Sequence, residues 1–212
     1  TNAEGEFRIE LPRTDDLRGY NNDLRLYYYV GNYKIQYSNV LVVDGRFQFN
    51  KYDINSDGII KETIHLRKLL DITTRINPDE ISEDFTDSLV IKVNVTNLDT
   101  NLLVVARMTN TDLISGLIFR EINSPAANAK MLDLGDVYRG YYLFTPIVWN
   151  NTFFWRANFL PSGTYEVYPH IFLRQKEIPQ ELLDSFGSKY EELNETYLKI
   201  PFTHNPDTLI IR

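Results

Sequence analysis

Closely spaced turn signals constrain the fold of this chain more than any other feature. Gly31-Asn32, Asp44-Gly45 and Asn150-Asn151 suit tight hairpin turns, and stretches in which apolar and polar residues alternate lie between such signals. The signals recur about every eight to twelve residues, a spacing typical of proteins built from short antiparallel strands. We therefore predict a mainly β protein of about ten strands, folded as an antiparallel β-sandwich.

One helix is expected near the C-terminal end of the chain. Residues 179–193 place Leu182, Phe186 and Tyr190 at helical spacing. A shorter helix, of one or two turns, is predicted to begin at Asn77-Pro78, because Pro suits the first helical position. The remaining elements are all predicted to be strands or loops, and the predicted strands include residues 59–66, 102–108 and 197–201.

Composition narrows the classes of protein to which the chain can belong. It has 212 residues, a net charge of −7 and no cysteine. The acidic balance argues against a nucleic-acid partner, and the lack of cysteine excludes disulfides and thiolate metal sites. No apolar run approaches the roughly 20 residues of a membrane-spanning helix. We expect residues 1–23 to form an N-terminal strand with its connector, and residues 24–212 to form a single β-sandwich domain.

A short motif near residue 160 makes the fold prediction more specific. Leu160-Pro161-Ser162-Gly163-Thr164-Tyr165 has the spacing of a tyrosine corner, in which a Tyr near the start of a late strand bonds back to the main chain. In this stretch the chain resembles the immunoglobulin-like β-sandwich modules of extracellular proteins. The resemblance implies a Greek-key topology, with a jelly roll as the alternative, and it implies nothing about function.

Sequence motifs give no support to catalysis. The chain lacks the Ser-elbow, zinc-protease, P-loop and dinucleotide-binding patterns. Its histidines are His65, His170 and His204. We expect the first two to be structural or solvated, whereas His204, in a loop close to Asp207, is a candidate base or ligand. We predict that the protein is not an enzyme.

The loop that follows residue 52 has the spacing of a calcium site. Side-chain oxygens and one main-chain carbonyl are predicted to face its centre, from Asp53, Asn55, Asp57 and Ile59. Gly58 stands where a calcium loop turns sharply.

The second half of this calcium motif is missing. Its twelfth position, which normally holds a Glu, is Ile64, and its ninth is Lys61; Glu62 could complete the shell only by a local distortion. The alternative is a hairpin loop in which Asp and Asn side chains bond neighbouring amides. The sequence leaves both interpretations open, with calcium as the expected cofactor in the first.

Two further sets of residues suggest contact with glycans. Sequons that would accept an N-linked glycan begin at Asn94, Asn150 and Asn194. Rings that could form a flat platform for sugars belong to Tyr141, Tyr142, Trp149 and Trp155. Asn150 is placed at the tip of a predicted aromatic hairpin, and the alternative for the rings is burial in the core or at an interface.

The N-terminal strand is the most suggestive feature of the sequence. In residues 6–11 one face carries Phe7, Ile9 and Leu11, and the other carries charged residues. A polar connector separates this strand from the rest, so it could fold back on its own domain or complete a sheet of a neighbouring copy.

Together these features predict a secreted or cell-surface structural protein. We expect a subunit of a self-assembling filament or layer, joined through the N-terminal strand and stiffened by calcium. The alternatives are a carbohydrate-binding or adhesin module and a viral or phage structural protein.

Overall fold

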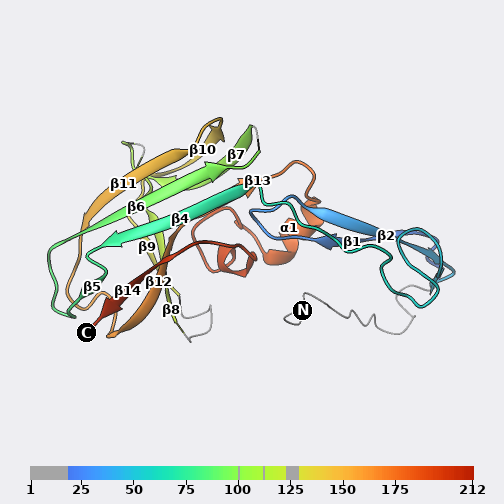
Figure 1. The fold of residues 1–212 in the computed structure, drawn as a ribbon, viewed down its shortest axis with the longest axis horizontal. Helices are drawn as coiled ribbons and strands as arrows, with labels where there is room; N and C mark the ends of the chain where they lie inside the picture. Colours follow the sequence, from blue (N-terminus) through green and yellow to red (C-terminus); the bar gives the residue numbers. More distant parts are fainter. Residues whose placement is uncertain (1–18, 100, 112, 123–128) are drawn as a thin grey trace. The chain divides into compact units, whose positions relative to one another are not determined.

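A computed structural model describes residues 19–99, 101–111, 113–122 and 129–212 (Figure 1). The elements in chain order are β1 (Asn22–Tyr28), β2 (Gln36–Val43), β3 (Arg46–Phe47), β4 (Leu70–Asn77), β5 (Glu80–Ile81), β6 (Ser88–Asn97), β7 (Leu102–Met108), β8 (Gly116–Glu121), β9 (Lys130–Asp133), β10 (Val137–Leu143), β11 (Ile147–Phe154), β12 (Gly163–Pro169), β13 (Ile171–Arg174), α1 (Gln180–Phe186), the 3₁₀ helix η2 (Tyr197–Lys199) and β14 (Asp207–Ile211). The protein is mainly β, as predicted.

The chain divides into two compact units, whereas the sequence predicted one domain that begins at residue 24. Of the described residues, unit 1 holds 19–28 and Gln36–His65, and unit 2 holds Tyr29–Ile35 and Leu66–Arg212. The chain therefore passes into unit 2 for one short segment, returns to unit 1, and enters unit 2 a second time.

Unit 1 is a small sheet with strand order β1-β2-β3. The predicted turn at Asp44-Gly45 joins β2 to β3, and both residues have positive φ, 48° and 71°. Its buried apolar side chains include Val40, Val42 and Ile54. A core of this size gives unit 1 little apolar burial to stabilise it.

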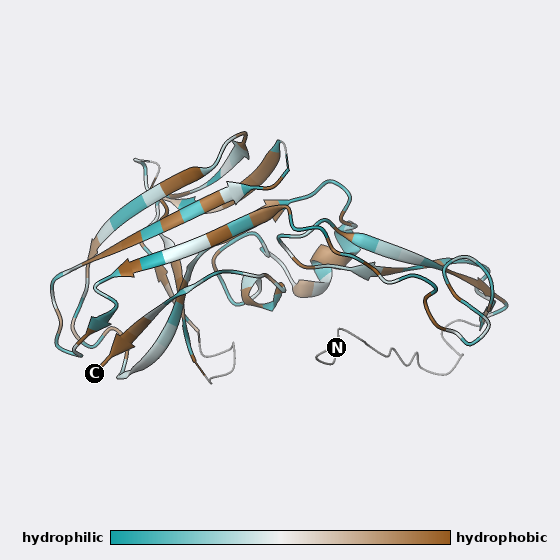
Figure 2. Ribbon diagram, viewed as in Figure 1, coloured by the Kyte–Doolittle hydropathy of each residue, from teal (hydrophilic) through white to brown (hydrophobic). Residues whose placement is uncertain are grey.

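Unit 2 is formed by three sheets, with strand orders β10-β7-β13, β11-β6-β4 and β5-β14-β12-β8-β9. Buried side chains from β4 and β6 belong to the same core cluster as those from β8, β12 and β14, so two layers face each other as in a β-sandwich. Along β4 and β6 the hydropathy alternates from one residue to the next (Figure 2). This alternation is the reason that one face of the sheet is buried and the other is exposed.

One extended segment belongs to two sheets of unit 2. Its first part, β12, pairs with β8 and β14, and its second part, β13, pairs with β7. The change falls at His170, which is fully buried and whose N–H donates to Gly116 O at 2.9 Å. Sequence alternation predicts the strand but not the change of partner.

Three predicted elements differ from the structure: one ends at another residue, and two are not strands. The helix predicted over residues 179–193 stops at Phe186, because Gly187 has φ 123° and leaves the helical conformation. Residues 197–201, predicted as a strand, begin with the 3₁₀ turn η2. Residues 59–66, also predicted as a strand, pair only through the bridge of Ile60 to Ile54.

The helix predicted at Asn77-Pro78 is also absent from the described chain. Residues 79–81 pair instead with the C-terminal strand: Ile210 N donates to Asp79 O at 2.8 Å, and Arg212 N donates to Ile81 O at 3.0 Å. These long-range main-chain bonds replace the intrahelical bonds that the local sequence favours.

Candidate functional sites

The loop predicted to bind calcium is a set of turns in unit 1. Asn55 Oδ1 accepts the N–H of Asp57 and of Ile59, each at 2.9 Å, and Asp53 Oδ2 accepts Asn39 N at 2.6 Å. Gly58 has φ 81°, and the ring of Phe49 lies close enough to leave little room for a Cβ. The side-chain oxygens thus act within the loop as the alternative interpretation predicted.

Calcium binding at this loop stays a prediction. No group of three or more His, Asp or Glu side chains placed to hold a metal ion is found among the described residues. Such a group would not include the Asn and main-chain oxygens of the predicted shell. Glu62 is exposed, and Lys61 Nζ donates to Tyr52 O at 2.7 Å.

Two of the predicted sequons lie within strands. Asn94 is half-buried in the central strand β6, and Asn150 is exposed in β11. The third, Asn194, bonds its own loop: its Oδ1 accepts Thr196 N at 2.7 Å and its Nδ2 donates to Lys189 O at 3.0 Å. Asn150 therefore presents the most accessible amide, and glycosylation itself stays a prediction.

The predicted aromatic hairpin across Asn150-Asn151 is wrong, and so is half of the predicted sugar platform. β10 pairs with β7 whereas β11 pairs with β6, so Asn150 lies in the middle of a strand rather than at a tip. Trp149 and Trp155 are buried in the core. Tyr142 is exposed, but it has no coplanar Trp beside it to form a platform.

The outer edge of β11 has no strand partner among the described residues of unit 2. Trp155 N donates to Asp87 O at 3.0 Å, just beyond the end of the β11–β6 ladder. In an antiparallel ladder this pattern repeats every second residue, so the N–H groups of Val148, Asn150, Thr152 and Phe154 point away from β6. Within the described parts of the chain no main-chain group bonds to that edge.

β11 lacks the features that normally protect an edge strand. Its sequence, IVWNNTFF, contains no charged residue and no Pro. Val148 and Phe154 expose 51% and 79% of their surface, and the Oδ1 of Asn151 is buried without a hydrogen-bond partner among the described residues. By contrast, edge strands β1 and β10 carry charged residues, and β4 is bonded along its outer side by Asn205.

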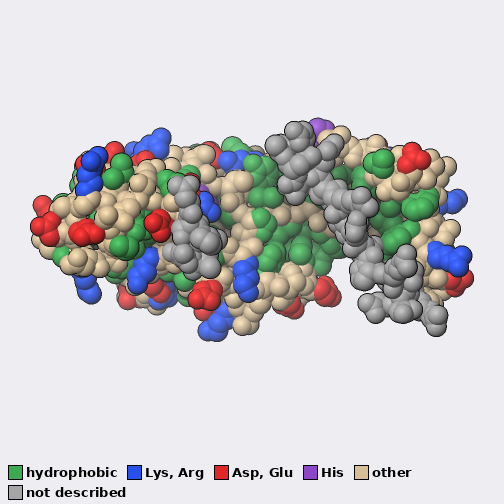
Figure 3. All heavy atoms as spheres, turned by 90° about the horizontal axis from the view of Figure 1, so that it is seen from below, with side chains coloured by type: hydrophobic (Ala, Val, Ile, Leu, Met, Phe, Trp, Pro, Cys, Tyr) green, Lys and Arg blue, Asp and Glu red, His purple; other side chains and the backbone are tan. Residues whose placement is uncertain are grey.

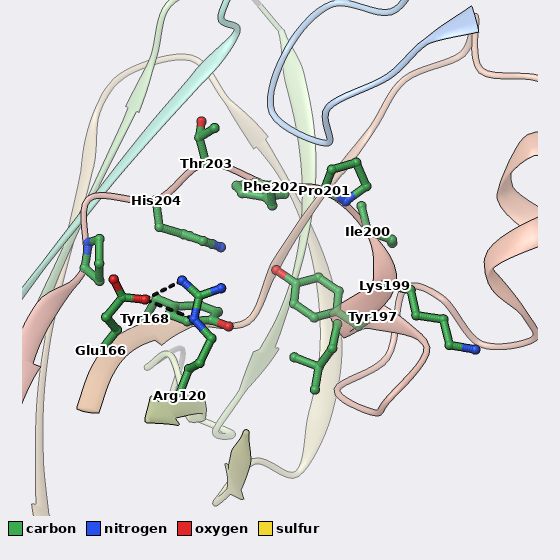
Figure 4. Close-up of a pocket in the computed structure, with 12 residues that line it drawn as sticks. Arg120, Glu166, Tyr168, Tyr197, Lys199, Ile200, Pro201, Phe202, Thr203 and His204 are labelled. Atoms are coloured by element: carbon green, nitrogen blue, oxygen red, sulfur yellow. Dashed lines mark hydrogen bonds and ion pairs between the residues drawn. The ribbon is translucent and has the colours of Figure 1, made fainter. Parts of the chain in front are cut away.

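A cleft of about 390 Å³ is the second candidate site of unit 2 (Figure 4). On one side, Arg120 on β8 faces Glu166 on the neighbouring strand β12. Arg120 Nε donates to Glu166 Oε2 at 3.0 Å, and Arg120 Nη2 donates to the same oxygen. The ion pair raises the pKa of Arg120 further above its ordinary value.

A stack of planar groups forms the wall beside this ion pair. The imidazole of His204 lies between Tyr168 and Phe202, with ring centres 4.4 Å and 4.6 Å away, and Arg120 lies 5.7 Å over Tyr168. A Cβ on Gly31 would lie 2.6 Å from the ring of Phe202. The glycine therefore allows its main chain to pass directly beside this ring, at the end of the stack. Burial, then the nearby Arg120 and Lys68, lower the pKa of His204 to about 3, which keeps the imidazole neutral.

Tyr197 closes the other side of the cleft. Its hydroxyl donates to Ile171 O at 2.8 Å and accepts Ile171 N at 3.3 Å, so it is held on the strand β13. Burial raises the pKa of Tyr197 far above its ordinary range.

Sequence reasoning named His204 but not its surroundings. Arg120, Glu166 and His204 come from three segments separated by at least 38 residues, and no local pattern connects them. Arg120 and Glu166 are neighbours because the register of β8 and β12 places them opposite each other. This register is known only from the structure of the sheet.

The N-terminal strand with Phe7, Ile9 and Leu11 lies outside the described residues. Among the described helices, none is long and apolar enough to cross a membrane. No family model, curated protein or solved structure matches this chain.

Proposed function

We propose that this protein is a non-enzymatic structural subunit that assembles with copies of itself by strand addition. The observation that carries the proposal is the uncharged, unpaired edge of β11. A row of free N–H and C=O groups is a template for another strand, and proteins that stay monomeric usually protect such rows. Here the row is eight residues long and is flanked by exposed apolar side chains.

The proposed donor is residues 6–11 of a neighbouring copy. Main-chain bonds to β11 would give affinity, and Phe7, Ile9 and Leu11 on one face would give specificity. A polar connector follows, and an extended chain spans about 3.3 Å per residue, so the segment can reach another molecule. Because donor and acceptor are different surfaces, the contact does not close on itself, and repetition gives an open filament.

Exposed apolar side chains on unit 1 offer a second contact surface. They belong to Tyr37, Val43, Phe49, Tyr52 and Ile59. Figure 3 shows hydrophobic side chains at the surface of this unit, at the right of the view. Location outside the cell and calcium binding to the loop at 53–59 are parts of the proposal that rest on the sequence alone.

The test is the molar mass of the protein across a range of concentrations, measured by light scattering after size exclusion. The full chain is expected to form concentration-dependent oligomers. Removal of residues 1–12 and the substitution Val148→Pro should each give monomers, since Pro at an outward N–H blocks pairing on the edge but not the ladder with β6.

Matched controls separate loss of the edge from loss of the fold. Val148→Thr keeps the β-branched shape and should assemble normally. Val148→Lys should block assembly, whereas Val90→Lys, on the same outer face but in a central strand, should not. A full chain that is monomeric at every concentration, or a Val148→Pro protein that still assembles, would contradict the proposal.

A further inference from the structure

We propose that the cleft between Arg120 and Tyr197 binds one uncharged pyranose residue of a carbohydrate. This site shares no residue with the sugar platform expected from the sequence, and it is independent of the β11 edge. Figure 4 shows Arg120, Tyr168 and His204 on one side of the cleft and Tyr197 with Ile200 on the other.

The ion pair holds a donor and an acceptor in fixed positions on one side of the cleft. Arg120 bonds Glu166 through Oε2 alone, so Glu166 Oε1 and Arg120 Nη1 have no hydrogen-bond partner among the described residues. A sugar hydroxyl both donates and accepts, and neighbouring ring hydroxyls present two such groups side by side. A carboxylate can accept from one hydroxyl and a guanidinium can donate to another, and such bonds are strengthened by charge.

His204 adds a second donor whose direction is fixed by the stack. Its Nδ1 is buried and has no hydrogen-bond partner in the described chain. Because an unpaired buried N–H is costly, the proton of the neutral imidazole belongs on Nε2. In Figure 4 the outer end of the ring points into the cleft, towards the space that also faces the hydroxyl of Tyr168.

The opposite side of the cleft is apolar and suits the C–H face of a sugar ring. The hydroxyl of Tyr197 is already bonded to Ile171, and Ile200 lies next to Tyr197. Both residues are largely buried, with 3% and 5% of their surface exposed, so this side offers a small surface without a free donor from Tyr197. Polar groups on one side with apolar groups on the other orient a ligand that has both kinds of surface.

Charge argues for an uncharged ligand rather than an anion. Glu166 compensates the charge of Arg120, and the ammonium of Lys199 points away from the cleft in Figure 4. Among the described residues that line the cleft, no uncompensated cation therefore faces the space where a carboxylate or phosphate would have to lie, and an anion would lie beside Glu166.

The experiment is a titration of the full chain with the methyl pyranosides of glucose, galactose and mannose, with glucuronate as the charged comparison. Heteronuclear NMR is the readout, with the signals of Arg120 and His204 as reporters. At least one neutral sugar should bind saturably in the millimolar range, and its affinity should not change with salt. Glucuronate should bind more weakly.

Two variants and one control locate the binding. Glu166→Gln and His204→Phe should each weaken binding by about tenfold, the effect of losing one strong hydrogen bond. His204→Phe keeps a planar ring in the stack, so its fold should be preserved. Glu191→Gln breaks the Arg174–Glu191 ion pair outside the cleft and should leave sugar affinity unchanged.

Three outcomes overturn the proposal: none of the three neutral sugars binds, glucuronate binds more tightly and loses affinity with salt, or Glu166→Gln has no effect. The result is separable from self-assembly, because the Val148→Pro protein, expected to be monomeric, should bind the sugar with the affinity of the parent chain.

Discussion

At the scale of single residues, polar side chains that bond to the main chain fix the loops of both units. Asn55 bonds two amides of its own loop, and Tyr165 bonds Pro161 O at 2.9 Å in the tyrosine corner predicted from the sequence. In unit 2, Asn32 is fully buried, and its side chain bonds Leu70 O at 3.0 Å and Thr203 O at 2.8 Å. The first two residues fix the conformation of a local loop, whereas Asn32 links segments that are far apart in the sequence.

The substitution Tyr165→Phe removes only the hydroxyl of the tyrosine corner. We expect the free energy of unfolding to fall by about 1 kcal/mol, the usual effect of losing one hydrogen bond, with some further loss because Pro161 O is left without its partner. Urea unfolding followed by fluorescence measures the change. The control, Tyr142→Phe, alters a 62% exposed ring and should have no effect; equal stability of the two variants would contradict the corner's role.

Substitutions at Asn55 and Asp57 distinguish the two interpretations of the loop. Asn55→Ala removes the acceptor of two amides and should destabilise unit 1 by about 1 kcal/mol even with a calcium chelator present. The carboxylate of Asp57 accepts one side-chain hydrogen bond from the described residues, a long one of 3.5 Å from Ser56 Oγ, so Asp57→Ala should have no effect unless calcium binds. Thermal unfolding with and without calcium decides between them, and a calcium-dependent effect of Asp57→Ala would establish the metal site.

At the scale of elements, close approach of main chains fixes how the layers of unit 2 meet. Where the strand changes sheets at His170, β8 passes so near that a Cβ on Gly116 would lie 2.7 Å from the Cβ of Arg107 and 3.2 Å from that of His170. A side chain at residue 116 would therefore force these strands apart.

Gly116→Ala should destabilise the protein by about 1–3 kcal/mol, the usual cost of overpacking a core. Gly140→Ala on β10 is the matched control, because the nearest atom to its Cβ is the end of the Leu103 side chain, at 3.3 Å. Denaturant unfolding of both variants is the measurement. A Gly116→Ala protein as stable as the Gly140→Ala protein would show that the corner can relax.

The sequence predicted correctly those elements that depend on neighbouring residues alone. Residues 102–108 were predicted as a strand and form β7, and the positive φ angles at Asp44-Gly45 follow from turn chemistry. The turn predicted at Asn150-Asn151 is wrong because this pair is also tolerated inside an edge strand. Whether it forms a turn or a strand depends on pairing with β6, which is distant in sequence. The cleft was beyond prediction for the same reason, since strand register places Arg120 beside Glu166.

At the scale of the whole molecule, the two units differ in how much core each possesses. The large core cluster contains residues of unit 2 only, whereas unit 1 buries few apolar side chains and exposes several. Regions with little apolar burial open at lower free energy than the global unfolding of the protein. Unit 1 is therefore expected to be the less stable unit.

Native-state hydrogen exchange should show this difference directly. Amides of β1 and β2 are expected to exchange faster than those of β6 and β7, which lie in the core of unit 2. Measurements at several low concentrations of denaturant give the opening free energy of each strand. Equal protection in β2 and β6 would mean that the units unfold together.

Buried histidines make the stability of the molecule depend on pH. Burial lowers the pKa of His170 from 6.5 to about 4, so this residue binds a proton in the unfolded state before it does in the folded state. The folded state is therefore favoured above pH 6.5 and loses about 3 kcal/mol from His170 alone as the pH falls to about 4. His204 acts in the same direction.

The measurement is the free energy of unfolding between pH 7 and pH 4. His170→Gln should reduce the slope against pH, whatever its effect on stability at neutral pH. His65→Gln, which changes an exposed side chain, should keep the slope of the parent chain. Identical slopes in all three proteins would contradict the role of His170.

The short passage of residues 29–35 through unit 2 determines how a pulling force would travel along the chain. Tension applied at the N-terminal segment runs through β1 into residues 29–35, which are held in unit 2 at several points. The ring of Tyr29 packs on Phe186, Gly31 N donates to Pro201 O at 2.6 Å, and the side chain of Asn32 is bonded to Leu70 and Thr203. β2, β3 and the loop at 53–59 follow that anchor and end at a second entry into unit 2. The covalent path of the load thus enters unit 2 before it reaches β2, and the strength of the connection depends on the hold of residues 29–35 together with the β1–β2 ladder.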